Sequence, residues 1–135
     1  PNAFHFPISK VDGYDFSFSG LKTAALRQIK ALEGQNFSKE DFCASFQNCI
    51  AQTLLKKVKS ALVEYPYKQV VLAGGVAANS EIRKVFLNLE NEGYKTFIPQ
   101  LKYCTDNASM VASCAYFFED ALDNIDVEVF SRFKH

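Results

Sequence analysis

Apolar residues alternate with polar ones, or run together, in three short stretches of the chain, and each stretch predicts a β-strand. Residues 14–19 alternate strictly, which is typical of a strand with one buried face. Residues 69–73 form an unbroken apolar run, which favours a strand covered on both faces. A third strand is expected over residues 94–98, where Pro99 follows and stops it.

Other segments carry apolar residues at helical spacing. Residues 21–32 predict a helix that follows Gly20 and stops at Gly34. Ser38, with Asp41 three residues later, predicts a capping-box start for a long second helix, which Pro66 ends. The apolar stripe of that second helix comprises Phe42, Phe46, Ile50, Leu54, Val58, Leu62 and Tyr65.

Two further helices are expected in the second half of the chain. Asn79 or Ser80 can cap a helix that Asn91 and Gly93 end, with Ile82, Val85, Phe86 and Leu89 as its apolar positions. The last helix is expected over residues 108–122, opened by Thr105 and Asp106. Its side chains are apolar almost all round, so we expect it to lie deep in the structure. The tail from Asp123 has mixed character and predicts no element.

The resulting β-α-α-β-α-β-α order predicts an α/β fold with a mostly parallel sheet flanked by helices. Residues 1–135 are expected to form a single domain that corresponds to one lobe of a larger protein. The chain begins at Pro1 rather than at a methionine, which also favours an excerpt from something longer.

Charge and cysteine usage narrow the class of protein. Lysine plus arginine and aspartate plus glutamate number 15 each, and this neutral balance argues against a dedicated nucleic-acid module. Cys43, Cys49 and Cys114 occupy apolar helical patterns and are interpreted as small core residues in a reducing compartment. The histidines stand at opposite ends, so a metal site from the chain's own Cys and His is not expected. With no signal peptide and no run of about 18 apolar residues, we expect a cytoplasmic protein.

Gly74, Gly75 and Asn79 follow the second expected strand and form the strongest candidate site. Ligands of open α/β sheets bind at the carboxyl ends of strands, where glycines let the backbone approach a ligand closely. The helix that follows offers free N–H groups to a phosphate or a polar sugar. Asn79 can cap this helix and still present an amide to a ribose or a base. An ordinary tight turn with an Asn cap explains the same residues, and both interpretations stay open.

Asp106 is the second candidate, as a metal ligand at a loop-to-helix junction. A helix cap at Thr105 or Asp106 explains this segment better locally, because the helix dipole favours a carboxylate in the first turn. One carboxylate cannot hold a metal, so other ligands have to come from elsewhere. Residues 16–23 lack the leading glycine and the contiguous Gly-Lys pair of a phosphate loop, and no serine-hydrolase elbow occurs in the chain.

Taken together, three segments resemble the TsaD family, formerly labelled Gcp, O-sialoglycoprotein endopeptidase or M22-like glycoprotease. They are DFSFSGLKTA at residues 15–24, AGGVAANS at residues 73–80 and CTDNA at residues 104–108. All three stand in the order of the family, and each is weaker alone than in combination. The resemblance spans nearly the whole chain and covers the C-terminal part of the family.

The resemblance implies the C-terminal lobe of a two-lobed actin/Hsp70-like (ASKHA) ATPase fold. It implies a transferase that moves a threonylcarbamoyl group from threonylcarbamoyl-AMP to N6 of the adenosine beside the tRNA anticodon. Gly74, Gly75 and Asn79 match the family segment that holds the nucleoside of the adenylate or of ATP. Asp106 matches the carboxylate that ligates a divalent metal, iron or zinc, which acts as a Lewis acid. TsaB-like and TsaE-like subunits are the implied protein partners.

The histidine motif of the family, His-x-x-x-His, is not found in these 135 residues. We therefore expect the isolated fragment to be inactive as a transferase and to bind nucleotide and metal weakly. Two alternatives stay open: a non-catalytic TsaB-like scaffold, against which Cys104–Asn107 counts, and the metalloprotease of the old label, for which a zinc site is lacking. Phe117 and Phe118 could also pair two fragments in a homodimer, or be ordinary core residues.

Overall fold

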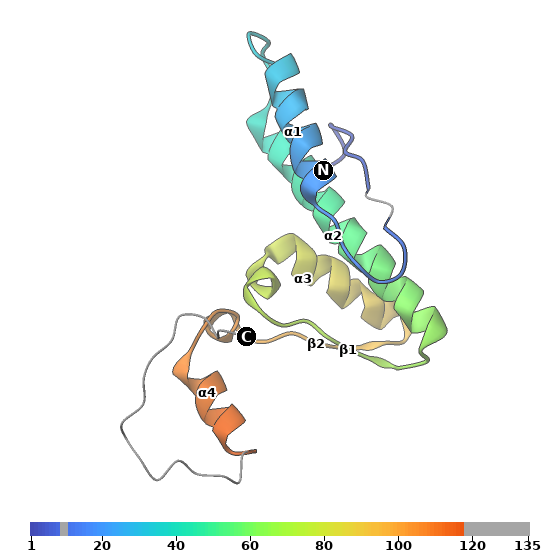
Figure 1. Cartoon of the computed structure of the whole chain (residues 1–135), viewed down its shortest axis with the longest axis vertical. Helices are drawn as coiled ribbons and strands as arrows, with labels where there is room; N and C mark the ends of the chain where they lie inside the picture. The colour runs from blue at the N-terminus through green and yellow to red at the C-terminus, as the bar shows by residue number, and fades with distance from the viewer. Residues whose placement is uncertain (9–10, 118–135) are drawn as a thin grey trace, which may run out of the picture. The chain divides into compact units, whose positions relative to one another are not determined.

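The computed structural model describes residues 1–8 and 11–117, and the chain divides into two compact units between Thr105 and Asp106. The first unit contains all elements but the last (Figure 1). In chain order the elements are α1 (Ser19–Ala31), α2 (Lys39–Glu64), β1 (Gln69–Val71), the 3₁₀ turn η1 (Gly75–Ala78), α3 (Ser80–Leu87), the 3₁₀ turn η2 (Asn88–Glu92), β2 (Lys95–Phe97), the 3₁₀ turn η3 (Leu101–Tyr103) and α4 (Ala108–Ala115).

The sheet of the first unit consists of β1 and β2, which pair in parallel with Val70 opposite Thr96. Parallel neighbours need a crossover, and α3 supplies it. The predicted α/β class, with a small parallel sheet flanked by helices, is therefore confirmed. The strands predicted at residues 69–73 and 94–98 are also confirmed, with shorter bounds than expected.

The core of the first unit forms where α3 meets α2 and β1. Its buried members are Ala51, Val70, Ile82, Val85, Phe86 and Leu89. The four apolar positions predicted for the third helix are thus all buried, although Leu89 belongs to η2 because the α-helix ends at Leu87. Gly93 then closes this segment with a positive φ of 86°, as its predicted role at the helix end requires.

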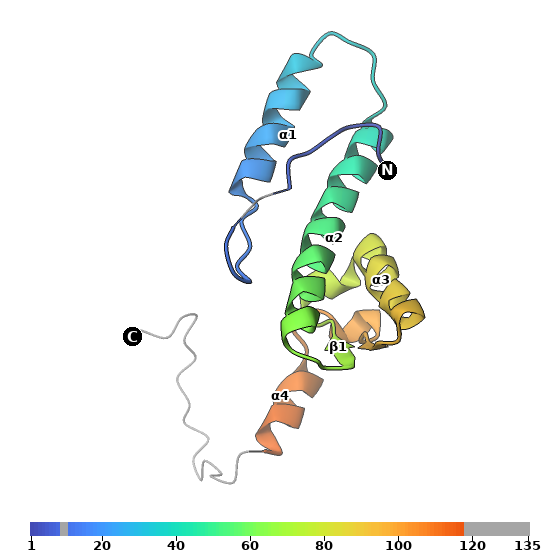
Figure 2. The same ribbon diagram turned by 90° about the vertical axis from the view of Figure 1, so that its right-hand side faces the viewer.

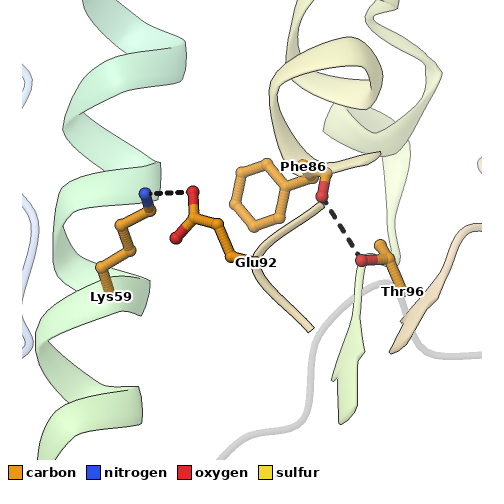
Figure 3. A network of polar contacts seen from close by, with 4 residues as sticks. All are labelled: Lys59, Phe86, Glu92 and Thr96. Atoms are coloured by element: carbon orange, nitrogen blue, oxygen red, sulfur yellow. Dashed lines mark hydrogen bonds and ion pairs between the residues drawn. The ribbon is translucent and has the colours of Figure 1, made fainter. Parts of the chain in front are cut away.

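Two polar contacts join α2 to η2 and β2 to α3 beside this core (Figure 3). Lys59 Nζ of α2 forms an ion pair of 2.6 Å with Glu92 Oε1 of η2. Thr96 Oγ1 of β2 donates a hydrogen bond of 3.3 Å to the carbonyl oxygen of Phe86. The ion pair is exposed and contributes little, so the apolar contacts determine how α3 packs.

The long helix α2 begins where the sequence predicts, because Ser38 Oγ accepts a hydrogen bond of 3.0 Å from the Asp41 N–H. The N-terminal residues pack on its first turns through edge-to-face aromatic contacts of Phe4 and Phe6 with Phe42. Gln28 Nε2 of α1 donates a hydrogen bond of 2.7 Å to the His5 carbonyl oxygen. Figure 2 shows this N-terminal segment between α1 and α2.

The strand predicted over residues 14–19 does not form. Residues 15–18 have no regular structure, and α1 already begins at Ser19, so Gly20 lies inside its first turn. A strand needs a partner for its backbone N–H and C=O groups, and within the described residues only β1 and β2 pair. The loop before these residues is held by one side chain of α2 instead. Lys57 Nζ donates hydrogen bonds to the carbonyl oxygens of Val11 and Gly13.

Three predictions about burial are wrong. Val71 of β1 is 71% exposed, so this strand is covered on one face only. The described helix α4 contains no buried residue, contrary to the deep position predicted for it, and residues 118–122 of the predicted helix lie outside the described residues. Cys49 is buried as predicted, whereas Cys43 and Cys114 are exposed. Apolar spacing identifies an apolar face but does not show whether another element covers it.

We predict that Leu89→Ala destabilises the protein by about 2–5 kcal/mol, because its side chain is 1% exposed and the substitution leaves a cavity in the core. Leu87→Ala is the matched control two residues earlier, where the side chain is 45% exposed and a change within about 0.5 kcal/mol is expected. Urea unfolding measures both free energies. Equal losses in the two variants would contradict the packing described for α3.

Tyr14 gives a prediction for alkaline pH. Its hydroxyl donates a hydrogen bond to Glu64 at the end of α2, and this contact raises the pKa of Tyr14 from 10.0 to about 12. The folded state therefore holds this proton more tightly than the unfolded state. The contribution of the contact to stability is complete below pH 10 and is lost as the pH rises to about 12.

We expect the melting temperature of the wild type to fall more steeply over that range than that of Tyr14→Phe. Tyr67→Phe, which removes the hydroxyl of a more exposed tyrosine, is the control and should retain the wild-type slope. Parallel pH profiles for the wild type and Tyr14→Phe would show that the Tyr14–Glu64 contact does not form in solution.

Candidate nucleotide-binding site

The turn after β1 contains the three residues singled out in the sequence. Gly74 has φ 80° and ψ 178°, and Gly75 begins the 3₁₀ turn η1. Backbone hydrogen bonds of 3.0 Å from Ala77 N to the Gly74 oxygen and from Asn79 N to the Val76 oxygen close this turn. Gly74, Gly75 and Asn79 thus lie together in one short segment at the carboxyl end of β1, where α/β sheets bind ligands.

The two glycines differ in whether the fold requires the absence of a side chain. The dihedral angles of Gly74 belong to a region that is open almost only to glycine. Gly75 has no positive φ, and a Cβ built there meets no atom within 4 Å. The fold of this chain therefore requires glycine at position 74 but not at position 75. Gly75 is exposed, which leaves its backbone accessible to an external group.

Asn79 caps α3, as predicted, by accepting a hydrogen bond of 3.0 Å from the Ile82 N–H at its Oδ1 atom. Within the described residues its amide nitrogen has no hydrogen-bond partner, so it can donate to a ligand. Glu81 already places a negative charge in the first turn of α3. That charge disfavours a phosphate at this helix end and favours a neutral polar group such as a ribose or a base.

A cavity of about 440 Å³ adjoins Asn79. It lies between α1 and α2, and apolar groups from both helices dominate its lining. The lining residues are Lys22, Ala25, Leu26, Ile29, Phe42, Cys43, Phe46, Gln47, Ile50 and Asn79. An apolar hollow whose lining includes two amides and one ammonium group has the general composition of a small-molecule site.

The segment that holds Asp106 differs from the prediction in its helix cap. Asn107, rather than Thr105 or Asp106, is the N-cap of α4, and its Oδ1 accepts a hydrogen bond of 2.9 Å from the Met110 N–H. Asp106 is exposed and precedes the cap. Three consecutive residues here are able to cap a helix, so only the backbone geometry selects one of them.

The described residues contain no group of side chains that could hold a metal ion together. No three His, Cys, Asp or Glu side chains gather there in a metal-binding group. Asp106 and His5 belong to different compact units. Asp106 alone does not make a metal site, because a single carboxylate needs further ligands.

Arg83 is a residue that the sequence interpretation missed. From α3 its guanidinium donates a hydrogen bond of 2.8 Å to the Ala77 oxygen in η1 and another of 2.8 Å to the Pro99 oxygen after β2. No sequence signal distinguishes it from an ordinary exposed helix arginine. Its acceptors are backbone carbonyl oxygens, which every residue possesses.

A parallel β-α-β unit with an open glycine turn at the end of its first strand defines an α/β protein with a candidate ligand site at the sheet edge. Comparison of sequences gives the family. The chain belongs to the TsaD family, because the family's sequence model, described as tRNA N6-adenosine threonylcarbamoyltransferase, matches residues 1–113. The resemblance found in the three sequence segments is therefore confirmed.

Curated relatives agree with this assignment. The chain is similar to the tRNA N6-adenosine threonylcarbamoyltransferase of Thermosipho africanus, with 47% identity over 85% of this chain and 36% of the relative. The protein of that name from Porphyromonas gingivalis is 42% identical over 98% of this chain and 41% of the relative. The chain thus spans well under half the length of these relatives. Within residues 1–8 and 11–117, every helix is too short or too polar to span a membrane.

The two glycines of the turn give a matched pair of substitutions. Gly74→Ala is expected to destabilise the protein by about 1–3 kcal/mol, because alanine at this φ and ψ is strained. Gly75→Ala should change the free energy of unfolding by less than about 1 kcal/mol, since its φ is not positive and its Cβ meets no atom within 4 Å. Thermal or urea unfolding tests this. Equal costs at the two positions would contradict the backbone conformation described for Gly74.

Proposed function

We propose that this chain is part of a tRNA N6-adenosine threonylcarbamoyltransferase and that its Gly74–Asn79 turn holds the nucleoside portion of threonylcarbamoyl-AMP. Family membership supplies the reaction class. The single observation that carries the binding role is the open backbone at Gly75, beside the half-buried Asn79 amide. The fold itself does not require a glycine at position 75. In the same proposal residues 1–135 belong to the C-terminal lobe of an actin/Hsp70-like fold.

The chemistry of the turn suits a nucleoside. Gly75 lets the ligand approach the backbone, and the Asn79 amide nitrogen donates to an acceptor on the ribose or the base. The apolar cavity between α1 and α2 offers a surface on which a base can lie away from water. These residues bind and orient the donor, so that its acyl group is held for attack by the tRNA amine.

Asp106 stays in the proposal as one carboxylate ligand of iron or zinc, with the remaining ligands from residues outside those described. When bound, such a metal supplies Lewis-acid polarisation. Because the described residues do not form a metal site by themselves, we expect the isolated chain to have no transferase activity. A cytoplasmic location and TsaB-like and TsaE-like partner subunits belong to the same proposal.

The test compares Gly75→Val with the wild type in the complete protein. Branched side-chain atoms at position 75 should weaken adenosine binding, measured by titration calorimetry, by at least about tenfold, or about 1.4 kcal/mol. Ala31→Val adds the same kind of side chain at an exposed position at the end of α1 and should bind like the wild type. Unchanged binding in Gly75→Val would remove the turn from the site.

The reaction itself needs a second measurement. The complete wild-type protein, with its partner subunits, should form threonylcarbamoyladenosine from tRNA and threonylcarbamoyl-AMP, with nucleoside analysis by mass spectrometry as the readout. Gly75→Val should raise KM for the adenylate. Failure of the wild type to modify tRNA, with a homologous transferase active in the same assay, would overturn the proposed function.

A further inference from the structure

Arg83 bridges two segments that lie far apart in the sequence. Its Nη1 atom donates to the Ala77 oxygen, six residues earlier, and its Nη2 atom to the Pro99 oxygen, sixteen residues later. Nη1 also lies 3.7 Å from the Sγ atom of Cys104. One guanidinium thus contacts the turn that follows β1 and the loop that follows β2.

The charge of Arg83 has no acidic partner among the described residues. It is half-buried, and its recorded acceptors are two carbonyl oxygens and one sulfur. Such acceptors stabilise a partly desolvated guanidinium, because hydrogen bonds to a charged donor are stronger than those between neutral groups. The two hydrogen bonds therefore favour the conformation in which both carbonyl groups are in place at the same time.

Contacts within the loop after β2 give it a compact structure of its own. The Cys104 side chain is buried, and its thiol donates to the Gln100 oxygen at 3.5 Å. The N–H groups of Tyr103 and Cys104 donate to the oxygens of Gln100 and Leu101, which closes η3. The Arg83 fork therefore holds a compact turn at each end rather than two extended loops.

We propose that Arg83 is a positioning residue that couples the conformation of the Gly74–Asn79 turn to that of residues 99–104. A ligand that orders the turn then also orders the second segment, because both depend on one guanidinium. The coupling of the two segments rests on the geometry alone. The effect of a nucleoside on it rests on the proposed function.

Arginine suits this role better than lysine. Its planar fork presents donors in two directions at once, whereas the ammonium of lysine is a compact charge at the end of a flexible stem. Arg83→Lys retains the charge but should hold the two carbonyl groups less well. Arg83→Met keeps an apolar stem and removes every donor. Lys84→Met is the matched control, because it removes a cation from the next, exposed position of α3.

Hydrogen exchange of the complete protein without ligand is the first experiment. In Arg83→Met the amides of Ala77 and Asn79, and those of Tyr103 and Cys104, should exchange roughly tenfold faster, while the α2 amides keep their wild-type rates. Lys84→Met should match the wild type. Faster exchange in only one of the two segments, or only within α3, would overturn the coupling.

If Arg83→Met does not fold, Arg83→Lys serves as the test variant in its place. Folded Arg83→Lys should show faster exchange in both segments, and wild-type exchange in this variant would overturn the proposal. Adenosine is then added as the probe. It should slow exchange at Tyr103 and Cys104 in the wild type and should not do so in Arg83→Lys.

The arms of the experiment separate the two proposals. If adenosine does not bind the wild type, the proposed function of the turn fails, while the ligand-free exchange still decides the role of Arg83. If adenosine binds and slows exchange at Tyr103 and Cys104 equally in both proteins, the function of the turn stands and the role of Arg83 is overturned. Weaker adenosine binding, by about tenfold, is expected in Arg83→Lys.

Discussion

Burial of one face of α3 is the interaction on which the rest of the first unit depends. Ile82, Val85 and Phe86 pack with Ala51 of α2 and Val70 of β1, and Leu89 completes the cluster. Each fully buried side chain of this size contributes about 1.5–3 kcal/mol, which exceeds the worth of the exposed Lys59–Glu92 pair. Because α3 also connects β1 to β2, the same packing brings the two strands into parallel register.

The candidate site follows from this packing. With α3 fixed, Asn79 stands at its first turn, and the Gly74–Ala78 segment has to close the short path from β1 to that cap. Gly74 provides the one backbone conformation in this path that other residues avoid. Arg83, one turn further along α3, reaches back to Ala77 and across to Pro99. A side chain of α3 thereby stabilises the turn that precedes this helix.

Features that depend on residues close together in the sequence were predicted correctly. The caps at Ser38 and Asn79 each join a side chain to an N–H three residues later, so the sequence contains both partners. The strand predicted over residues 14–19 failed because strand formation depends on a distant partner. The exposure of Val71 and of helix α4 could not be predicted from the sequence either, since burial depends on which element covers an apolar face.

By itself the sequence determined the family, the positions of the helices and the Gly-Gly-to-Asn turn, because these rest on residue identity and short spacing. Only the tertiary structure decided that glycine is required at position 74 and free at position 75, and that Asn107 rather than Asp106 caps α4. It also revealed the reach of Arg83 to Ala77 and Pro99. Those features depend on backbone angles and on carbonyl groups that every residue carries, so folding alone selects which of them meet.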